Sequence, residues 1–488
     1  MNTSEIKAKT LNATKWSSVT ELLAKIISPI INMILARILA PEAFGVLATI
    51  NMIIAFADVF IESGFQNFLI QHEFKDEQEE HQYMDVAFWC NLILSLLIWL
   101  IIFIFRNSIA KFVGNGDVGN VIVIACGVVP LSAIIGIQNC IIKKKLEFKK
   151  LFFVRVPTSV VPLFVTIPLA LLGFDYWALI IGNIVGTVIR SILLFVIGKY
   201  RPRFYFDFSK LLYMAKFGSI TLLDGLAIWG TNWIDTLLIA STMTDYQLGL
   251  YKNSISLITN LFSIVTASIT PVLFSSLSQL QNNQEEFNDM FIGTQKVLCT
   301  LLLPMGLGMF LYRDLVTKII LGDKWSEATM IVGLTAITLA VRTIFSSINS
   351  QAYRAKGKFA IPLLLQILDL ALLVPTCILS ARFGFETLVY SRSIIRLDLI
   401  IPGLILLYII CRINPITTLK KLLPCFFSSL VMCVCALLLQ KISNTFLWSF
   451  LSIFICIIIY FSILCIFKSE RKTIKEFARK FFKTKRAN

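Results

Sequence analysis

The chain has 488 residues, of which 57% are hydrophobic and only 15% are charged. Soluble domains are nearer one-half apolar and one-quarter charged, so a water-soluble fold could not bury this much apolar surface. The formal net charge of +16 is compatible with nucleic-acid binding, but the distribution of the basic residues along the chain argues against that partner.

Fourteen apolar runs follow one another along the chain. Runs of roughly 20 residues match the ~30 Å hydrocarbon core of a bilayer, and backbone groups inside lipid must be paired within a helix. The sequence therefore predicts an all-α integral membrane protein with fourteen transmembrane helices. Their ranges are 16–37, 44–65, 85–105, 119–142, 153–172, 176–198, 214–240, 248–273, 293–312, 327–350, 359–381, 386–411, 421–440 and 445–467.

The orientation of these helices follows from the basic residues between them. The polar segment 1–15 has no cleavage pattern after it, so the first apolar run is predicted to be retained. Most of the 45 Lys and Arg residues lie in alternate segments, among them 1–15, 141–155, 198–216 and 468–488. The positive-inside rule places these segments, and therefore both termini, in the cytoplasm.

Two similar stretches indicate an internal repeat. LARILAPEAFGVLATINM at 35–52 and LIASTMTDYQLGLYKNSI at 238–255 align Ala36 with Ala240 and Gly45 with Gly249, an offset of 204 residues. This offset spans six predicted helices, an even number, so the repeat is parallel. The predicted organisation is a lobe of helices 1–6 in 1–207, a lobe of helices 7–12 in 208–415, helices 13–14 in 416–467, and a basic amphipathic cytoplasmic tail in 468–488.

Polar side chains lie inside several apolar runs, where a charge costs about 2.5–3.5 kcal/mol on insertion scales. Glu21, Lys25 and Asn32 share helical spacing, which indicates either a hydrated cavity or structural contacts, such as a Glu21–Lys25 pair that neutralises itself. We predict a cavity lined by the first two helices of each lobe. The candidate cavity residues are Lys25, Asn32, Asn51, Asp58, Asp224, Asp235, Lys252 and Asn260, with Glu21, Glu62 and Arg190 as further candidates.

Other chemistry is not indicated by the sequence. It contains no nucleotide-binding loop, zinc motif or nucleophile elbow, and its eleven cysteines have no metal or redox spacing. A membrane polysaccharide polymerase would need a large external loop, and the longest predicted one, 313–326, is short. The chain is therefore not predicted to be an enzyme, and no metal or cofactor is expected. Arg392, Arg396 and Asp398, close together in helix 386–411, are interpreted as a structural pairing.

Four stretches carry a resemblance to a known family. They are ARILAPEAFGVLA at 36–48, LGLYKNSISLI at 248–258, PVLFSSLSQLQ at 271–281 and LGDKWSEA at 321–328. Together with the fourteen helices, they resemble the Wzx-type polysaccharide and O-antigen flippases of the multidrug/oligosaccharidyl-lipid/polysaccharide exporter superfamily. The group with colanic-acid-like exopolysaccharides is the most similar.

The resemblance implies a V-shaped pair of lobes around a central cavity. It implies alternating-access transport of undecaprenyl-diphosphate-linked oligosaccharide repeat units from the inner to the outer leaflet of the bacterial cytoplasmic membrane, for O-antigen, capsule or exopolysaccharide assembly. Polysaccharide polymerase machinery is the implied partner. Relatives use cationic cavity residues for the lipid diphosphate, and the resemblance implies this role for Lys25, with Lys252 and Arg190 as alternatives.

Two questions stay open at the level of sequence. A cation-coupled exporter and a lipid II-type flippase of the same superfamily are alternative functions, although drug exporters usually have twelve helices. The energy source is also open, because Asp58, Asp224 or Asp235 could bind H⁺ or Na⁺, or downstream polymerisation could remove the product without any coupling ion.

Overall fold

The computed structural model describes residues 3–62, 65–198, 200–358, 360–443, 445–467 and 470–471. Within these ranges it leaves out the side chains of residues 3–15, 18, 62, 67, 217, 220, 268 and 271. The predicted tail at 468–488 lies outside the described residues except for Glu470 and Arg471.

The described chain is helical throughout, without a strand in the described ranges. Twelve of its helices are long and apolar enough to cross a membrane, and counting each of two bent pairs as one span raises the number to 14. The bent pairs are Phe208–Lys216 with Thr221–Thr242, and Asp245–Ala267 with Val272–Gln279. These pairs coincide with the predicted spans 214–240 and 248–273. The predicted all-α membrane fold is confirmed, and the predicted count of fourteen is reached when each bent pair is one span.

Two compact units make up the chain. The first contains Met1–Asn260 and Gln366–Arg392, and the second contains Leu261–Leu365 and Ser393–Asn488. This division differs from the predicted lobes 1–207 and 208–415 and does not test them, so the lobes stay a prediction.

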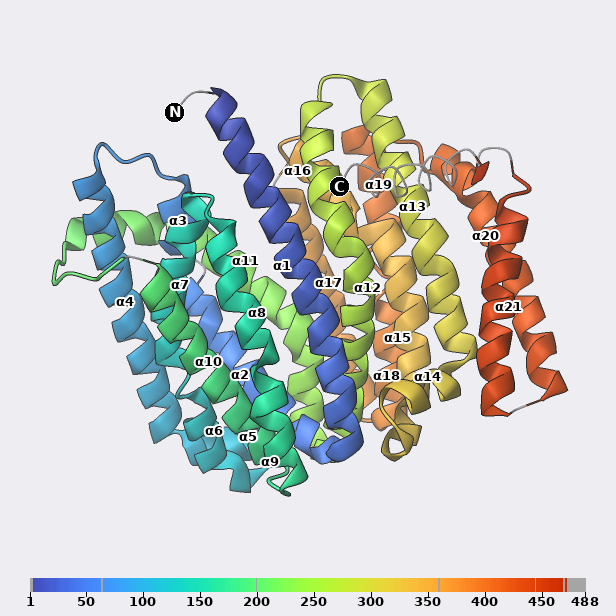
Figure 1. The fold of residues 1–488 in the computed structure, drawn as a ribbon, viewed down its shortest axis with the longest axis horizontal. Coiled ribbons are helices and arrows are strands. Elements are labelled where there is room, and N and C mark those ends of the chain that lie inside the picture. The colour runs from blue at the N-terminus through green and yellow to red at the C-terminus, as the bar shows by residue number, and fades with distance from the viewer. Residues whose placement is uncertain are drawn as a thin grey trace. The chain divides into compact units, whose positions relative to one another are not determined.

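The longer segment of the first unit begins with α1 and ends within α12. Its helices are α1 (Thr3–Ile38), α2 (Pro41–Glu62), α3 (Phe65–Gln71), α4 (Glu77–Ile104), α5 (Arg106–Phe112), α6 (Gly119–Cys126), α7 (Val129–Lys144), α8 (Phe148–Phe164), α9 (Thr166–Leu171), α10 (Tyr176–Ile197), α11 (Phe208–Thr242) and the first part of α12 (Asp245–Gln279). Figure 1 shows α1 running alongside α8. Phe68 of α3, Met84 of α4 and Ile137 of α7 belong to one buried hydrophobic core.

The second unit holds α13 (Gln284–Leu311), α14 (Arg313–Ile320), α15 (Thr329–Arg342), α16 (Asn349–Ala355), α19 (Ile400–Cys411), α20 (Pro415–Ile442) and α21 (Phe446–Leu464). Helices α17 (Ala360–Ala381) and α18 (Phe385–Ile395) belong in part to each unit. Within the second unit, α13 packs against α15 and α20, and α20 packs against α21 (Figure 1).

Side-chain caps and prolines explain where several helices begin and break. The Asp76 carboxylate accepts the Glu79 amide at 2.7 Å at the start of α4, and Asp207 accepts the amides of Ser209 and Lys210 at the start of α11. Pro168 has no amide hydrogen to donate to the Phe164 carbonyl oxygen, so the predicted span 153–172 is divided at Val165 into α8 and α9.

Candidate functional site

A polar cavity of about 470 Å³ lies inside the first unit. Residues of helices α1, α2, α8, α9 and α10 line this open cavity, with one residue from α12. Its polar lining consists of Ser28, Asn32, Asn51, Thr158, Ser159, Thr166, Asn183, Thr187, Arg190 and Asn260. Amide and hydroxyl groups in this number are unusual inside membrane helices and can exchange hydrogen bonds with the hydroxyls of a sugar.

Helix α10 forms one wall of the cavity with residues spaced four apart along one side of the helix. Gly182, Gly186 and Arg190 follow one another every four residues, so they lie on the same side of the helix. A Cβ on Gly182 would lie 1.8 Å from Thr166 Oγ1, so the missing side chain allows α9 and α10 to approach closely. A Cβ on Gly186 would meet nothing within 4 Å, so the wall is open at this point.

The charge of the lining is positive. Arg190 is the one ionisable side chain among the described residues that line the cavity. A guanidinium among neutral amides favours a neutral or anionic ligand, because it can form paired hydrogen bonds with phosphate or carboxylate oxygens.

Four of the eleven predicted site residues meet in this cavity, namely Asn32, Asn51, Arg190 and Asn260. Asn32 also donates a hydrogen bond from Nδ2 to Asn253 Oδ1 at 2.8 Å, which connects α1 to α12. Lys25 is half-buried on α1, seven residues before Asn32 and three before Ser28, so the three residues share one helix face. The stripe predicted along α1 therefore leads into the cavity, and the substrate contact predicted for these residues stays a prediction.

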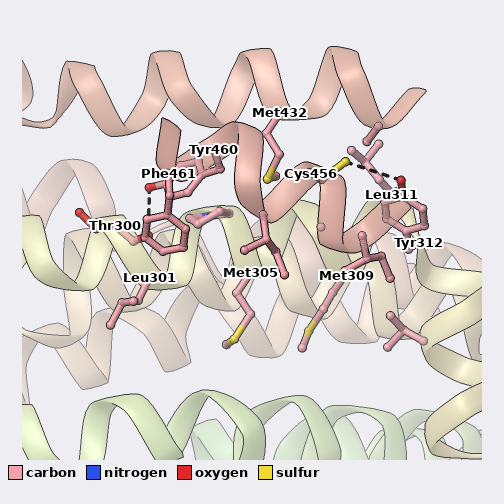
Figure 2. A pocket seen from close by; sticks show the side chains of 16 residues that line it. Thr300, Leu301, Met305, Met309, Leu311, Tyr312, Met432, Cys456, Tyr460 and Phe461 are labelled. Atoms are coloured by element: carbon pink, nitrogen blue, oxygen red, sulfur yellow. Dashed lines mark hydrogen bonds between the residues drawn. The ribbon is translucent and has the colours of Figure 1, made fainter. Parts of the chain in front are cut away.

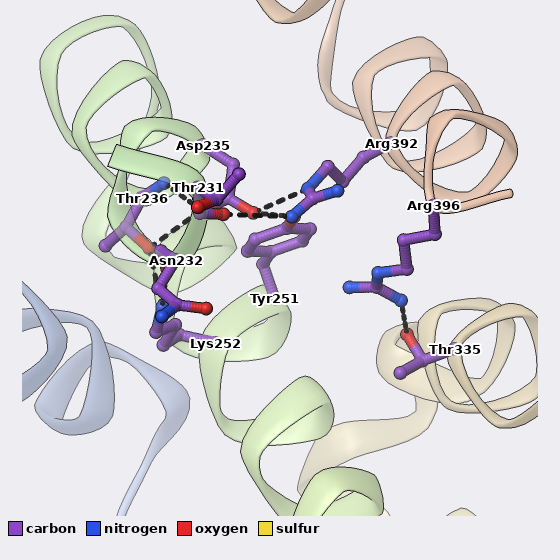
Figure 3. A network of polar contacts seen from close by, with 9 residues as sticks. All are labelled: Thr231, Asn232, Asp235, Thr236, Tyr251, Lys252, Thr335, Arg392 and Arg396. Carbon is purple, nitrogen blue, oxygen red and sulfur yellow. Dashed lines mark hydrogen bonds and ion pairs between the residues drawn. The ribbon is translucent and has the colours of Figure 1, made fainter. Parts of the chain in front are cut away.

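Asp235 and Lys252 belong to a separate polar network, drawn in Figure 3. Asp235 is buried and accepts hydrogen bonds from Arg392 Nε at 2.9 Å and from the Tyr251 hydroxyl at 2.8 Å. The Thr236 amide donates to the other carboxylate oxygen at 2.7 Å. The ion pair of Arg392 is thus with Asp235 of α11, 157 residues away in the chain, and not with the neighbouring Asp398.

Lys252 is engaged in the same network. Its ammonium donates to the Asn232 carbonyl oxygen at 2.9 Å and to Thr236 Oγ1 at 3.0 Å, and it lies 3.8 Å from the centre of the Trp233 ring. Figure 3 also includes a hydrogen bond of the second unit, from Arg396 Nη1 to Thr335 Oγ1 at 3.1 Å. These contacts are the kind expected of polar groups that connect helices in a membrane.

The remaining predicted residues lie at several places in the first unit. Glu21 accepts a hydrogen bond from Arg155 of α8 at 2.5 Å, so its ion pair is with α8 and not with Lys25 as one interpretation suggested. Asp58 is half-buried on α2, two turns beyond Asn51, and Asp224 is half-buried on α11. The side chain of Glu62 lies outside the described residues.

The second unit contains a pocket of different chemistry, with a volume of about 420 Å³ (Figure 2). Residues of helices α13, α14, α20 and α21 line it, among them Met305, Met309 and Met432. Tyr460 donates its hydroxyl hydrogen to the Thr300 carbonyl oxygen at 2.9 Å, so the polar end of that ring is satisfied. Flexible methionines and aliphatic side chains provide a surface for alkyl groups and not for sugars.

Metal chemistry has no support in the described residues. No group of three or more His, Cys, Asp or Glu side chains in these ranges could hold a metal ion.

The fold defines a multi-pass helical membrane protein, and its membrane helices line a polar cavity. Carriers for polar solutes have this arrangement. Residues 34–330 match the family model described as "Polysaccharide biosynthesis protein", and the chain belongs to this family.

Individual relatives agree with the family. The chain is 24% identical over 312 residues to the succinoglycan biosynthesis transport protein ExoT of Rhizobium meliloti, covering 64% of this chain but only 62% of that protein's length. It is 22% identical to the lipopolysaccharide biosynthesis protein WzxC of Escherichia coli, covering 78% of this chain and 76% of the relative. It is 23% identical to the teichuronic acid biosynthesis protein TuaB of Bacillus subtilis, covering 72% of each.

Solved structures show the same fold. The lipid II flippase MurJ in an inward closed conformation superposes with a TM-score of 0.76 at 16% identity, covering 94% of this chain and 99% of that chain. An inward-facing multidrug resistance transporter of the MATE family, from the MOP superfamily, superposes with a TM-score of 0.61 at 14% identity, covering 81% and 96% of the two chains. The predicted fold class is therefore confirmed, and these two structures are named as a flippase and a transporter.

Proposed function

We propose that this protein is a flippase for undecaprenyl-diphosphate-linked oligosaccharide repeat units, which it moves from the inner to the outer leaflet of the bacterial cytoplasmic membrane. Membership of a polysaccharide biosynthesis family and relatives named for succinoglycan and lipopolysaccharide biosynthesis support this assignment. The MurJ-like fold supports it further. Both termini lie in the cytoplasm, in agreement with the basic segments at 1–15 and 468–488.

The observation that carries the proposal is the composition of the cavity in the first unit. Its substrate has a sugar–diphosphate head that cannot enter hydrocarbon and a polyprenyl tail that should remain there. Asn32, Asn51 and Asn260 offer amide groups to sugar hydroxyls inside about 470 Å³ of space. Arg190, four residues after Gly186, offers a guanidinium to the diphosphate.

Lys25 extends this cationic surface along α1. It lies one turn before Ser28, a cavity-lining residue, on the same face of the helix. A diphosphate carries more charge than one guanidinium neutralises, so Lys25 and Arg190 act together on the head group as it enters. The tail stays in lipid beside the protein during the passage, and the cavity then opens to the outer leaflet.

The direct test is transport by the purified full-length protein in liposomes. Labelled undecaprenyl-diphosphate oligosaccharide is placed in one leaflet, and its arrival in the other is measured with a membrane-impermeant sugar oxidant. The wild-type protein should accelerate this transfer. Arg190→Gln and Lys25→Gln should each slow it by about tenfold, the effect of losing one charged hydrogen bond.

Lys318→Gln is the matched control, because Lys318 is an exposed cation in the second unit that pairs with the exposed Asp323. A loss of transport in this variant equal to that of Arg190→Gln would contradict a specific role for the cavity. Wild-type liposomes that fail to translocate any lipid-linked oligosaccharide would contradict the proposed function itself.

The energy source is a separate proposal. Asp58, Asp224 or Asp235 would bind a coupling H⁺ or Na⁺, since each is a carboxylate on a membrane helix. At Asp235 the ion would compete with the hydrogen bonds from Arg392, Tyr251 and Thr236. Neither Asp58 nor Asp224 lines the cavity, so the ion would act on helix packing and not on the substrate. Transport that is unchanged when the ion gradients are collapsed would instead favour product removal by a polysaccharide polymerase.

A further inference from the structure

A second polar pocket, separate from the cavity, lies where α3 meets the beginning of α11. It has a volume of about 430 Å³ and is lined by Phe68, Gln71, His72, Tyr213 and Lys216. Nothing in the proposed transport path uses it.

Aromatic rings form the walls of this pocket. The Phe68 ring is buried in the core of the first unit and stacks on the His72 ring with 4.6 Å between the ring centres. The Tyr213 ring meets both of them edge-on, at 5.6 Å from Phe68 and 5.8 Å from His72. Because the three rings support one another, the pocket has a defined shape in the absence of any ligand.

Lys216 and His72 bring hydrogen-bonding groups to the pocket. Within the described part of the chain, no hydrogen bond or ion pair engages the Lys216 ammonium or the His72 ring nitrogens. Two nearby lysines differ in this respect. Lys144 pairs with Glu80 at 2.8 Å, and Lys210 donates to Gln82 and to the Tyr205 hydroxyl.

The chemistry of the pocket favours an anionic oxygen group. An ammonium, an imidazole, an amide and a phenol can all donate hydrogen bonds, and the five lining residues include no carboxylate. Phosphate is the ligand that this donor set suits best, and the volume accommodates it together with a small alcohol such as glycerol.

The location of the pocket indicates that the phosphate belongs to a lipid. The first segment of α11, Phe208–Lys216, is bent by 52° from the membrane-spanning segment Thr221–Thr242. Phe208 and Leu212 on this segment are 69% and 63% exposed, as expected of a short helix that lies along the membrane surface. A pocket on such a helix is at the depth of the lipid phosphates.

We propose that the pocket formed by Phe68, Gln71, His72, Tyr213 and Lys216 binds the phosphate of a membrane lipid at the cytoplasmic surface. Lys216 and His72 hold the phosphate oxygens, the aromatic rings contact the glycerol or the first carbons of the lipid, and the chains extend beside Leu212. Occupancy anchors the bent beginning of α11 to the membrane. This binding does not depend on the proposed transport function.

Native mass spectrometry of the full-length protein in detergent tests the proposal. The probes are phosphatidylglycerol, undecaprenyl diphosphate and inorganic phosphate, each titrated separately. Phosphatidylglycerol should be retained, and Lys216→Gln should weaken its binding by about tenfold. His72→Gln should weaken it as well, which provides a second variant if the first does not fold.

Lys421→Gln is the matched control, since it removes the same charge from an exposed lysine of the second unit. Equal binding by Lys216→Gln, Lys421→Gln and the wild type would overturn the proposal. So would displacement of the lipid by millimolar inorganic phosphate, which would mark a site for free anions. Retention of undecaprenyl diphosphate but not phosphatidylglycerol would support a lipid phosphate and identify its source as the transported lipid.

Discussion

Gly45, the fifth residue of α2, lies against the backbone of Asp245, the first residue of α12. A Cβ on Gly45 would be 1.9 Å from the Asp245 carbonyl oxygen. The contact is reciprocal. Gly249 and Pro41 are the repeat equivalents of Gly45 and Asp245, and a Cβ on Gly249 would be 1.8 Å from the carbonyl oxygen of Pro41, the first residue of α2. The two turns that the sequence repeats are therefore in contact with each other, and glycine is required on both sides.

Gly45→Ala is expected to lower the free energy of unfolding by about 1–3 kcal/mol, because the new methyl group meets backbone atoms that cannot move aside as a side chain could. Gly249→Ala should have a similar effect for the same reason. Thermal unfolding of the purified protein in detergent measures both changes.

The control for the glycine variants is Gly293→Ala in α13, where a Cβ would meet nothing within 4 Å. Alanine favours a helix over glycine by about 0.5–1 kcal/mol, so this variant should be unchanged or slightly stabilised. If Gly45→Ala were as stable as Gly293→Ala, the close contact between the two turns would not exist in the folded protein.

Asp235→Asn is expected to destabilise the protein by about 3–5 kcal/mol, because it leaves the buried Arg392 charge without its counter-ion. Arg392→Gln should cost a similar amount. The double variant should cost less than the sum of the two, since it no longer leaves a buried charge uncompensated. Unfolding of the three variants in detergent gives the coupling energy.

The same variant separates a structural role of Asp235 from ion coupling. Asp235→Asn protein that unfolds like the wild type but no longer responds to collapse of the ion gradients would assign the carboxylate to coupling. It would also show that the ion pair with Arg392 does not stabilise the fold.

Tyr200→Phe is expected to cost about 1–3 kcal/mol of folding free energy. The Tyr200 hydroxyl donates to Asp85 at 2.6 Å, and Asp85 is 2% exposed with one further donor, the Arg203 amide, at 3.1 Å. Loss of the hydroxyl leaves part of a buried carboxylate without a hydrogen bond. Chemical unfolding at neutral pH measures the difference, with the exposed Tyr408→Phe as the control that should be silent.

The pH dependence of the Tyr200 contribution follows from its surroundings. Burial, together with the hydrogen bond to Asp85, raises the pKa of Tyr200 well above its ordinary value. The folded state therefore prefers the protonated phenol, and this stabilisation is complete below about pH 10 and is lost as the pH rises further. Wild-type protein should lose stability above that pH more steeply than Tyr200→Phe. Parallel alkaline curves for the two proteins would contradict this account.

The membrane helices could be predicted from the sequence because their signal is local. Apolar runs of sufficient length specify a span regardless of what surrounds them. The helix breaks were harder to predict. The predicted span 386–411 is divided into α18 and α19, and a π-helical turn at Thr343–Ser347 interrupts 327–350. Such irregularities depend on packing against other helices.

The site could be predicted only in part, because its residues meet through tertiary contacts. Spacing along α1 indicated the face that holds Ser28 and Asn32, but the partner of Glu21 is Arg155, 134 residues away. Asn183 and Thr187 were not predicted as cavity residues. A signal for them was present, since Gly182, Asn183, Gly186, Thr187 and Arg190 form one small and polar face on an otherwise apolar helix.

The paired glycine contacts of the two turns have the symmetry of a homodimer interface. In a two-fold dimer, residue i of one subunit touches residue j of the other while j touches i, and Gly45–Asp245 with Gly249–Pro41 follow this rule along a single chain. The two turns are therefore related by a local pseudo-two-fold axis, and this axis places a glycine against the partner turn on each side.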